Sequence, residues 1–407
     1  MKKYFNQMFL QKSKQIRKNL ILCMGATLLF SSCAVNKKLE SQVDNTLNRG
    51  ISQYSYLMKR LPNEGYPKTY YADKDKLETS KSGWWCSGFY PGTLLYLDEA
   101  ANKPIFKGEI DRVLQDLKRE QYNTKTHDLG FMMFCSFGNA NRLNPNPEYA
   151  EILMNSAKSL ASRFNETVGC IKSWDSPDDS YLVIIDNMMN LELLFWASEY
   201  SGDKKYYDIA VKHANTTLKN HFREDHSSYH VINYNGKTGE IKQKRTAQGA
   251  ADESAWARGQ SWGLYGYTVM YRATKDKKYL DQAVAIAEFI LNHPNLPKDK
   301  VPYWDFNAPN IPNALRDSSA GAIIASALLE LDAYVDKDLS KKYFTAAKTI
   351  LKTLTSDEYI AKEGTNGGFL LKHGVGSLPA NSEIDVPLTY GDYYLVEAML
   401  RYKKQVK

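Results

Sequence analysis

The chain has 407 residues and a formal net charge of +7, but six of its lysines and arginines lie in the first 18 residues, where there is no acid. Without these six the net charge is +1, so the basic balance gives no support for nucleic-acid binding. Past residue 32 no apolar run approaches the ~20 residues that a membrane span needs, so the rest of the chain is expected to be soluble.

The amino-terminal segment has the order of a secretory signal. Its basic residues are followed by an apolar run from Leu20 to Phe30 and then by Ser31, Ser32 and Cys33. A cysteine directly after small residues resembles a bacterial lipobox, whose cysteine is acylated and becomes the new amino terminus. We therefore expect residues 1–32 to be a lipoprotein signal peptide and Cys33 to be lipidated, with an ordinary cleaved signal or an uncleaved anchor as alternatives.

This interpretation predicts an exported bacterial lipoprotein of the periplasm or outer membrane, which touches a membrane only through its lipid. Residues 33–42 are polar and would be a tether. Three cysteines then remain, Cys86, Cys135 and Cys170. Their number is odd and their spacing matches no metal motif, so we expect small core residues and no disulfide framework.

Several cofactor and catalytic motifs are absent from the sequence. There is no HExxH, no CxxC pair and no calcium loop, and glycines occur without GxGxxG or a P-loop. The sequence thus predicts no metal and no cofactor. Because Gly-x-Ser-x-Gly is also missing, a serine hydrolase is disfavoured.

Two kinds of helix alternate along the mature chain, and no Pro/Gly/Ser-rich linker interrupts them after residue 42. About 370 mature residues would usually suggest two domains, yet this continuity favours a single catalytic domain over residues 43–407. One kind is apolar nearly all round, as in Met188–Ala197. The other is amphipathic, as in Lys204–Leu218, with one expected buried face made by Tyr207, Ala210, Val211, Ala214 and Leu218.

A weak repeat supports the alternation. The tripeptide Lys-Lys-Tyr recurs at Lys204, Lys277 and Lys341, each time near the expected start of an amphipathic helix. A period of roughly 60–70 residues suits one helical hairpin plus a long loop. Six hairpins closed in a ring, with apolar inner helices and amphipathic outer ones, predict an all-α (α/α)6 barrel; a superhelical repeat array is the alternative. Helices are expected to start near Val43, Ser87, Lys103, Asp128, Pro147, Asp186, Lys204, Ala257, Asp276, Asp317, Leu339 and Thr389.

The segment from Asp252 to Gly263 is the most informative part of the sequence. It sets Trp256 and Trp262 around Arg258 and Gln260 at a helix start. Flat apolar rings beside a fixed cation and an amide are suited to a sugar that carries a carboxylate, although a core aromatic pair with a capping arginine has the same pattern. Similar motifs precede the other inner helices, so a ring would bring them to one cavity, where helix amino termini favour an anion.

Two carboxylates stand out among these motifs, Asp128 and Asp186. Either could be an N-cap, the commonest reason for an aspartate at a helix start. Asp186, however, has apolar neighbours on both sides, which would raise its pKa toward neutrality, as a general acid requires. Asp128 lies beside His127, where it could stay ionised, so the pair has the divergent environments of acid and base. Of the histidines, only His127 and His230 are expected near the cavity; solvent or capping roles are expected for His213, His221, His226, His293 and His373.

Together these segments resemble the unsaturated glucuronyl hydrolases of glycoside hydrolase family 88, in order along most of the mature chain. The segments are Trp85–Gly92, His127–Gly130, Ile185–Asn187, Trp256–Trp262, Pro302–Phe306 and Arg316–Ala320. The resemblance implies an (α/α)6 barrel without a metal, with Asp186 as general acid/base and Asp128 as the second essential aspartate. It implies substrate contacts for Trp85, His127, Trp174, His230, Gln248, Trp256, Arg258 and Trp262.

The expected substrates are 4,5-unsaturated uronyl oligosaccharides of the glycosaminoglycan type, which polysaccharide lyases release. The expected reaction is hydration of the C4=C5 bond. An unsaturated rhamnogalacturonyl hydrolase or a conventional two-carboxylate glycosidase is the second interpretation. A lipoprotein that only binds oligosaccharides is the third, and it would have no need of a desolvated acid such as Asp186.

Overall fold

The computed structural model describes residues 37–176 and 178–406. The predicted signal peptide and Cys33 lie outside the described residues. The chain divides into two compact units, residues 1–45 and 46–407. In the first, residues 37–45 are helical. All other features described below belong to the second unit, which begins with helical residues 46–60.

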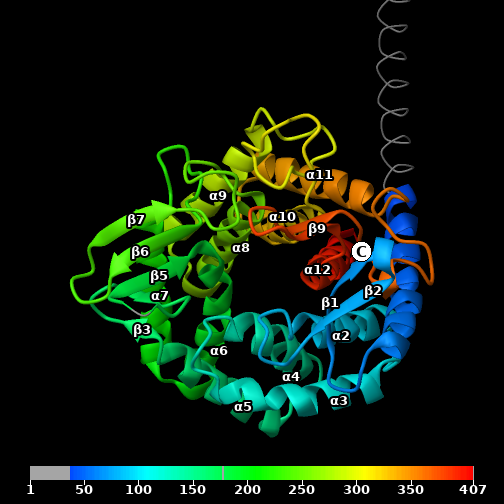
Figure 1. Cartoon of the computed structure of the whole chain (residues 1–407), viewed down its shortest axis with the longest axis horizontal. Helices are drawn as coiled ribbons and strands as arrows, with labels where there is room; N and C mark the ends of the chain where they lie inside the picture. Colours follow the sequence, from blue (N-terminus) through cyan, green and yellow to red (C-terminus); the bar gives the residue numbers. More distant parts are fainter. Residues whose placement is uncertain (1–36, 177, 407) are drawn as a thin grey trace, which may run out of the picture. The chain divides into compact units, whose positions relative to one another are not determined.

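Six helical segments form a closed inner ring in the second unit (Figure 1). Each packs against the next, and the last returns to the first, because α12 contacts α2. This closure makes the alternative of an open superhelical array wrong. In chain order the inner segments are α2 (Phe89–Ala101), η3 (Gly130–Gly138) with α4 (Asn139–Leu143), η4 (Ile185–Asn190) with α6 (Leu191–Ser201), α8 (Ala257–Thr274), α10 (Ser318–Leu331) and α12 (Thr389–Val406).

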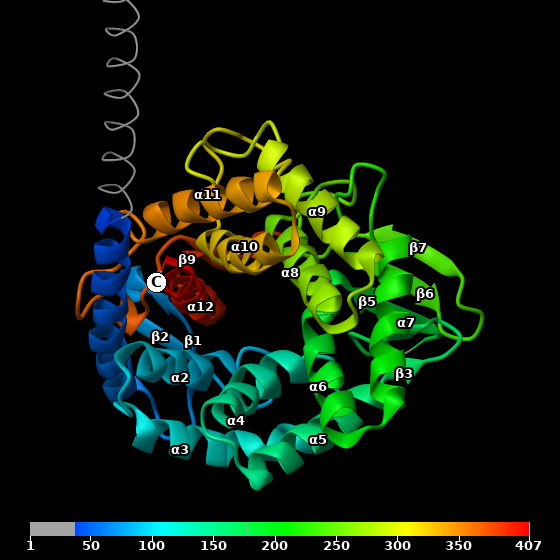
Figure 2. The same cartoon turned by 180° about the vertical axis from the view of Figure 1, so that it is seen from behind.

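An outer layer of helices packs on this ring and confirms the predicted (α/α)6 barrel, as the reverse view also shows (Figure 2). Predicted starts at Pro147, Lys204, Ala257 and Thr389 coincide with observed ones. The outer helices are residues 46–60, α3 (Lys107–Leu117), α5 (Pro147–Ala161), α7 (Lys204–Asn220), α9 (Lys277–Asn292) and α11 (Lys337–Leu354). Short 3-10 helices lie in the connections: η1 (Ala72–Lys74), η2 (Lys118–Tyr122), η5 (Asp332–Tyr334) and η6 (Asn366–Gly368).

The Lys-Lys-Tyr repeat has a packing role, because its tyrosines join neighbouring outer helices. Tyr279 of α9 donates a hydrogen bond to Asn215 of α7 at 2.9 Å. Tyr343 of α11 donates in the same way to Glu288 of α9, at 3.2 Å. An aspartate precedes each of these helices and caps its amino terminus. The repeat therefore lies in the first two turns of α7, α9 and α11 and places a buried tyrosine on each of these helices.

The buried face of α7 differs from the predicted one. It consists of Tyr206, Ala210, His213, Ala214 and Thr217, while Tyr207, Val211 and Leu218 are only half-buried. His213 is satisfied on this buried face because it accepts a hydrogen bond from the backbone N–H of Ile171. By contrast, the inner helix α10 is buried at every residue except Glu330, as its apolar sequence predicts.

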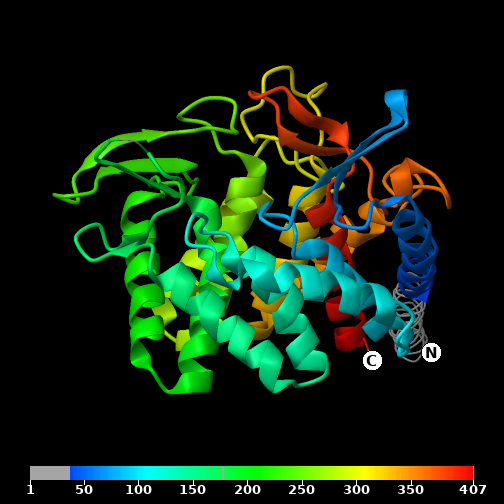
Figure 3. The same ribbon diagram turned by 60° about the horizontal axis from the view of Figure 1, so that its bottom comes forward.

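Short strands lie among the loops at one end of the helical ring, a feature that the sequence pattern did not predict (Figure 3). Each has six residues or fewer, too short for a clear alternation of apolar and polar residues. They pair in antiparallel sheets: β1 (Tyr66–Tyr71) with β2 (Lys76–Ser80), β3 (Phe164–Asn165) with β4 (Cys170–Ile171), β5 (Ser180–Ile184) with β6 (Val231–Asn235) and β7 (Ile241–Arg245), and β8 (Gly374–Ser377) with β9 (Ser382–Val386).

Cys86, Cys135 and Cys170 are unpaired, as predicted, and Cys86 and Cys170 are buried. Cys135 is half-buried. Within the ranges that the structure describes, every helix is too short or too polar to cross a lipid bilayer.

Candidate active site

A cavity of about 410 Å³ lies where the amino ends of the inner helices meet the strands. Its floor comes from the starts of η3, η4, α8 and α12, and its walls from β1, β5, β6, β8 and β9. The side chains that line it are mostly polar or aromatic: Lys68, Trp84, Trp85, His127, Asp128, Trp174, Asp186, His230, Gln248, Arg258, Ser377, Ser382, Glu383 and Tyr390.

Eight of the ten residues predicted for the site line this cavity: Trp85, His127, Asp128, Trp174, Asp186, His230, Gln248 and Arg258. Trp256 and Trp262 are placed differently, because they lie behind the cavity wall. The Trp256 ring packs on His230 at 4.6 Å between ring centroids, and Trp262 packs on Phe131 at 5.1 Å. Both are buried, so they support the lining residues in this geometry.

Strand pairing brings Asp186 and His230 together from distant parts of the sequence. In the β5–β6 register Ile184 lies opposite Val231, so the residue before Val231 meets the residues after Ile184. The backbone N–H of Ile185 donates to the carbonyl of His230 at 3.1 Å, which fixes the junction. Nε2 of His230 then lies 3.6 Å from Oδ2 of Asp186.

Burial raises the pKa of Asp186 to about 7, as the apolar neighbours in the sequence predicted. Arg258 and the indole N–H of Trp262 oppose this rise, whereas the negative charge of Asp128 adds to it. The start of η4 has no side-chain cap, so Asp186 is not an N-cap. It is a carboxyl group that can hold or release a proton near neutral pH.

Asp128 precedes η3 and is not a side-chain cap either. One of its oxygens accepts a hydrogen bond from the hydroxyl of Thr126 at 3.0 Å, and the other lies 3.3 Å from Nε2 of His127. Burial lowers the pKa of His127, so its imidazole is neutral at neutral pH. Asp128 is thus held in place by two neighbours while it faces the cavity.

Arg258 is anchored in the cavity wall by most of its N–H groups. It donates to the carbonyls of Val375 and Gly376, both at 2.6 Å, to Asp317 at 3.2 Å and to Gln248 at 3.3 Å. Its guanidinium also stacks over Trp256, with 4.3 Å to the ring centroid. Arg258 therefore supplies a fixed positive charge and joins α8 to β8. Its guanidinium N–H groups are mostly engaged within the protein and do not form a free fork for a ligand.

Several lining residues were missed by the sequence interpretation, chiefly Lys68, Trp84 and Glu383. Lys68 lies 2.9 Å from Glu78 and 3.7 Å from Glu383. Its ammonium also lies 5.4 Å from the Trp84 ring centroid. Trp84 directly precedes the Trp85–Gly92 segment, and its 44% exposure makes it an open platform at the cavity edge. Lys68 and Glu383 had no sequence signal, since both reach the cavity from hairpins that were not predicted.

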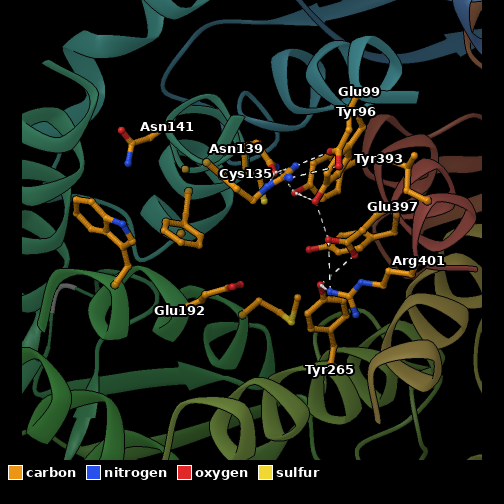
Figure 4. A pocket seen from close by; sticks show the side chains of 18 of the residues that line it. Tyr96, Glu99, Cys135, Asn139, Asn141, Glu192, Tyr265, Tyr393, Glu397 and Arg401 are labelled. Carbon is orange, nitrogen blue, oxygen red and sulfur yellow. Dashed lines mark hydrogen bonds and ion pairs between the residues drawn. The ribbon is translucent and has the colours of Figure 1, made fainter. Parts of the chain in front are cut away.

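A second cavity of about 490 Å³ lies at the opposite, carboxyl-terminal end of the inner helices (Figure 4). Its charges are paired within the protein. Glu397 accepts hydrogen bonds from the hydroxyls of Tyr96 and Tyr265 at 2.8 and 2.9 Å, and Arg401 lies 2.8 Å from Glu330. Because these partners already satisfy one another, we assign the chemistry to the first cavity.

The prediction of a solvent or capping role is wrong for His213, which is fully buried within α7. His221 is the C-cap of α7, as a capping role predicts, but it is fully buried as well. His221 lies with Nε2 at 3.2 Å from the carbonyl of Val183, and His213 accepts from Ile171 at 3.0 Å. Each thus fixes a strand behind the cavity. Burial lowers the pKa of both imidazoles, so they are neutral supports.

Comparison with known proteins identifies relatives over nearly the whole chain. An unsaturated glucuronyl hydrolase of Formosa agariphila is 43% identical over 390 residues, which are 94% of this chain and 97% of the relative. An unsaturated chondroitin disaccharide hydrolase of Streptococcus pneumoniae is 36% identical and covers 79% of this chain and 82% of its own. No protein-family model matches the chain.

Solved structures give the same result. The crystal structure of an unsaturated glucuronyl hydrolase specific for heparin has a TM-score of 0.87 and 46% identity, and covers 90% of this chain and 98% of its own. A Streptococcus agalactiae unsaturated glucuronyl hydrolase, solved as an Asp-to-Asn mutant with dGlcA-GalNAc6S, has a TM-score of 0.77 and 29% identity over 90% and 92% of the two chains. The chain therefore belongs to the unsaturated glucuronyl hydrolases of glycoside hydrolase family 88.

Proposed function

We propose that the protein hydrolyses 4,5-unsaturated uronyl oligosaccharides by hydrating the C4=C5 bond, with Asp186 as general acid and base. The observation that carries this proposal is the largely buried carboxyl group of Asp186, which lines the cavity and has a pKa raised to about 7. Relatives named for chondroitin disaccharides and for heparin support glycosaminoglycan fragments as the substrate class.

The first step follows from the chemistry of the substrate. The C4=C5 bond of the unsaturated uronate is an enol ether, so its C4 accepts a proton. Protonated Asp186 gives that proton, and the ring oxygen stabilises the oxocarbenium ion that forms at C5. Because the pKa of Asp186 is about 7, a useful fraction of the enzyme carries this proton at neutral pH.

In the second step the ionised Asp186 accepts a proton from a water molecule, whose oxygen adds to C5. The product is a hemiketal, which opens to a keto acid and releases the rest of the oligosaccharide. Asp186 ends the cycle protonated again, so no further proton donor is required. Asp128, held by Thr126 and beside His127, would stabilise the positive charge of the intermediate.

The cavity also supports recognition of a flat, anionic sugar. Arg258 provides a buried positive charge for the uronate carboxylate, and Gln248 and His127 provide hydrogen-bonding groups. Trp85 and Trp174 offer aromatic faces nearer the reacting ring, whereas the exposed Trp84 suits the leaving sugar.

A conventional two-carboxylate glycosidase on the same barrel is the second candidate, since Asp128 and Asp186 both line the cavity. The two functions differ in their need for the double bond. The test is to mix the enzyme with lyase-generated unsaturated disaccharides and with saturated glucuronides. We expect the absorbance of the conjugated double bond to disappear and the saturated compounds to be inert; cleavage of both at similar rates would favour the conventional glycosidase.

We also propose that the mature protein is a lipoprotein acylated at Cys33 and exported to the periplasm or outer membrane. The support is the order of basic, apolar and small residues before that cysteine. Expression with a labelled fatty acid tests this: the wild type should be labelled and sediment with membranes, and Cys33→Ala should not. An unlabelled wild type would contradict the proposal.

A further inference from the structure

Two buried polar atoms in the active site face each other without a hydrogen bond. They are Nε2 of His230 and Oδ2 of Asp186; neither has a hydrogen-bond partner, and they lie 3.6 Å apart. That distance is just beyond a normal hydrogen bond. A buried polar atom without a partner costs free energy, so a matched pair in this position points to a contact that forms during the reaction.

The backbone fixes which nitrogen of His230 carries the proton. Nδ1 accepts hydrogen bonds from the backbone N–H groups of Ala247 and Gln248, at 3.1 and 3.2 Å. An atom that accepts two hydrogen bonds holds a lone pair and no proton. The proton of the neutral ring is therefore on Nε2, the atom that faces Asp186.

The surroundings keep this imidazole neutral. His230 is 4% exposed and packs between the rings of Trp256 and Trp174. Burial lowers its pKa well below the usual range, and the charges of Arg258 and Arg245 add to that effect. A second proton on the ring is thereby disfavoured. His230 can only donate to Asp186 and cannot exchange a proton with it at neutral pH.

The groups around Asp186 come from two segments, α8 and the residues just before η3. Arg258 and Trp262 lie on α8, Asp128 precedes η3, and His127 lies beside Asp128. Arg258 and Trp262 favour the carboxylate, and Asp128 opposes it. His127 and His221, the other imidazoles near His230, are themselves neutral because burial lowers their pKa. His230 is thus a neutral donor that lies 3.6 Å from Oδ2, in addition to the indole N–H of Trp262.

We propose that His230 is a positioning residue which donates a hydrogen bond from Nε2 to Oδ2 of Asp186 once that carboxylate forms, leaving Oδ1 as the oxygen that exchanges the proton. This inference rests on the proposed acid/base role of Asp186. Its geometric support is that Oδ2 is buried while the Asp186 side chain keeps 13% exposure, which must belong to its other atoms. Contacts of this kind are often long in the free enzyme and tighten during the reaction.

The donor has a different effect in each half of the reaction. When Asp186 is protonated, Oδ2 needs no strong partner, and the gap to His230 stays open. After the proton has moved to C4, the negative charge on Oδ2 attracts the Nε2–H of His230. The carboxylate is then stabilised with one oxygen held, and Oδ1 is turned toward the water that adds to C5.

The first test measures the whole wild-type protein and uses one variant only to assign the His230 signals. Nitrogen-15 NMR of protein with labelled histidine, assigned by comparison with His230→Gln, reports the protonation of each ring nitrogen. We expect His230 to remain neutral with the proton on Nε2 between pH 5 and 8. A proton on Nδ1, or a charged ring in that range, would overturn the proposal.

The second test compares the pH dependence of kcat/KM in His230→Met, which removes the donor, and His230→Gln, whose amide N–H can replace it. Loss of a hydrogen bond to a charged group should raise the pKa of Asp186 by roughly one unit or more. The alkaline limb of the kcat/KM profile should therefore shift to higher pH in the Met variant and return toward the wild-type pH in the Gln variant. His221→Met, which removes a buried imidazole that faces Val183 instead, should leave the limb unchanged.

If His230 only contacts the sugar, both variants will raise KM and leave the pH limb in place, which would contradict a positioning role. The inference and the proposed function also fail in different ways. Full activity of Asp186→Asn would contradict the acid/base role of Asp186. If Asp186→Asn is inactive but the alkaline limb of His230→Met stays at the wild-type pH, the acid/base role of Asp186 stands. Only the contact proposed for His230 is then contradicted.

Discussion

Replacing Asp186 with asparagine is expected to lower kcat by roughly 10²–10⁴-fold or more while unsaturated disaccharides still bind. Asparagine keeps the shape of the side chain but cannot give a proton to C4 or take one from water. In the wild type, kcat/KM should fall as the pH rises through about 7, because Asp186 must be protonated in the free enzyme and its pKa is about 7. Turnover is followed by the loss of double-bond absorbance, and binding by calorimetry.

The stability of this variant provides its control for correct folding. The pKa of Asp186 is raised from 3.8 to about 7, so its contribution to wild-type stability is lost as the pH rises through that window. Asparagine does not titrate, so the Tm of Asp186→Asn should improve relative to the wild type over the same window. Asp332→Asn, which changes a buried aspartate of raised pKa at the carboxyl end of α10, where η5 begins, should keep wild-type turnover. Near-normal kcat in the Asp186 variant would refute the assignment.

Replacing Arg258 with lysine should weaken uronate binding and destabilise the protein, although the positive charge is kept. Lysine has three donors and no planar fork, so it cannot reach Val375, Gly376, Asp317 and Gln248 together. Losing one or two hydrogen bonds to charged or buried groups costs about 2–4 kcal/mol. We expect a lower free energy of unfolding by that amount, measured in urea, and a raised KM.

A matched substitution separates the anchoring of Arg258 from a general effect of lysine. Arg245→Lys changes a nearby arginine on β7 that makes one hydrogen bond, to the carbonyl of Thr246. That variant should stay close to the wild type in stability and KM. If Arg258→Lys also behaves as the wild type, the carboxylate is held elsewhere and the anchoring contacts are of little energetic value.

The barrel and its floor could be predicted because both depend on local sequence. Apolar inner helices recur around the ring, aspartate caps and buried tyrosines recur in α7, α9 and α11, and these signals act within a few residues of the helix they define. Asp186 was recognisable for the same reason, since the residues that desolvate it include its own sequence neighbours.

The walls of the cavity could not be predicted, because they depend on pairings between distant segments. Lys68 comes from β1 and Glu383 from β9, and Glu383 has a left-handed backbone (φ 56°) that no residue pattern indicates. The four backbone and side-chain partners of Arg258 were equally hidden, because three of them come from segments about 60 or more residues away in the sequence.

His213 shows a third limit, which concerns polar residues in the core. A histidine on a helix is usually placed at the surface, but this one is buried because it accepts a hydrogen bond from Ile171 of β4. With His213 buried, the buried face of α7 differs from the face that apolar spacing indicated. The partner of a buried polar group cannot be identified from spacing alone.

The position of water oxygen in the product tests the hydration mechanism most directly. In ¹⁸O-labelled heavy water, sampled early, the released keto acid should carry the label at C5 and one deuterium at C4, and the glycosidic oxygen should leave with the other sugar. These results follow from protonation at C4 by Asp186 and addition of water at C5. Label at C1 of the uronate, without carbon-bound deuterium, would contradict the mechanism and show that the enzyme attacks the anomeric carbon.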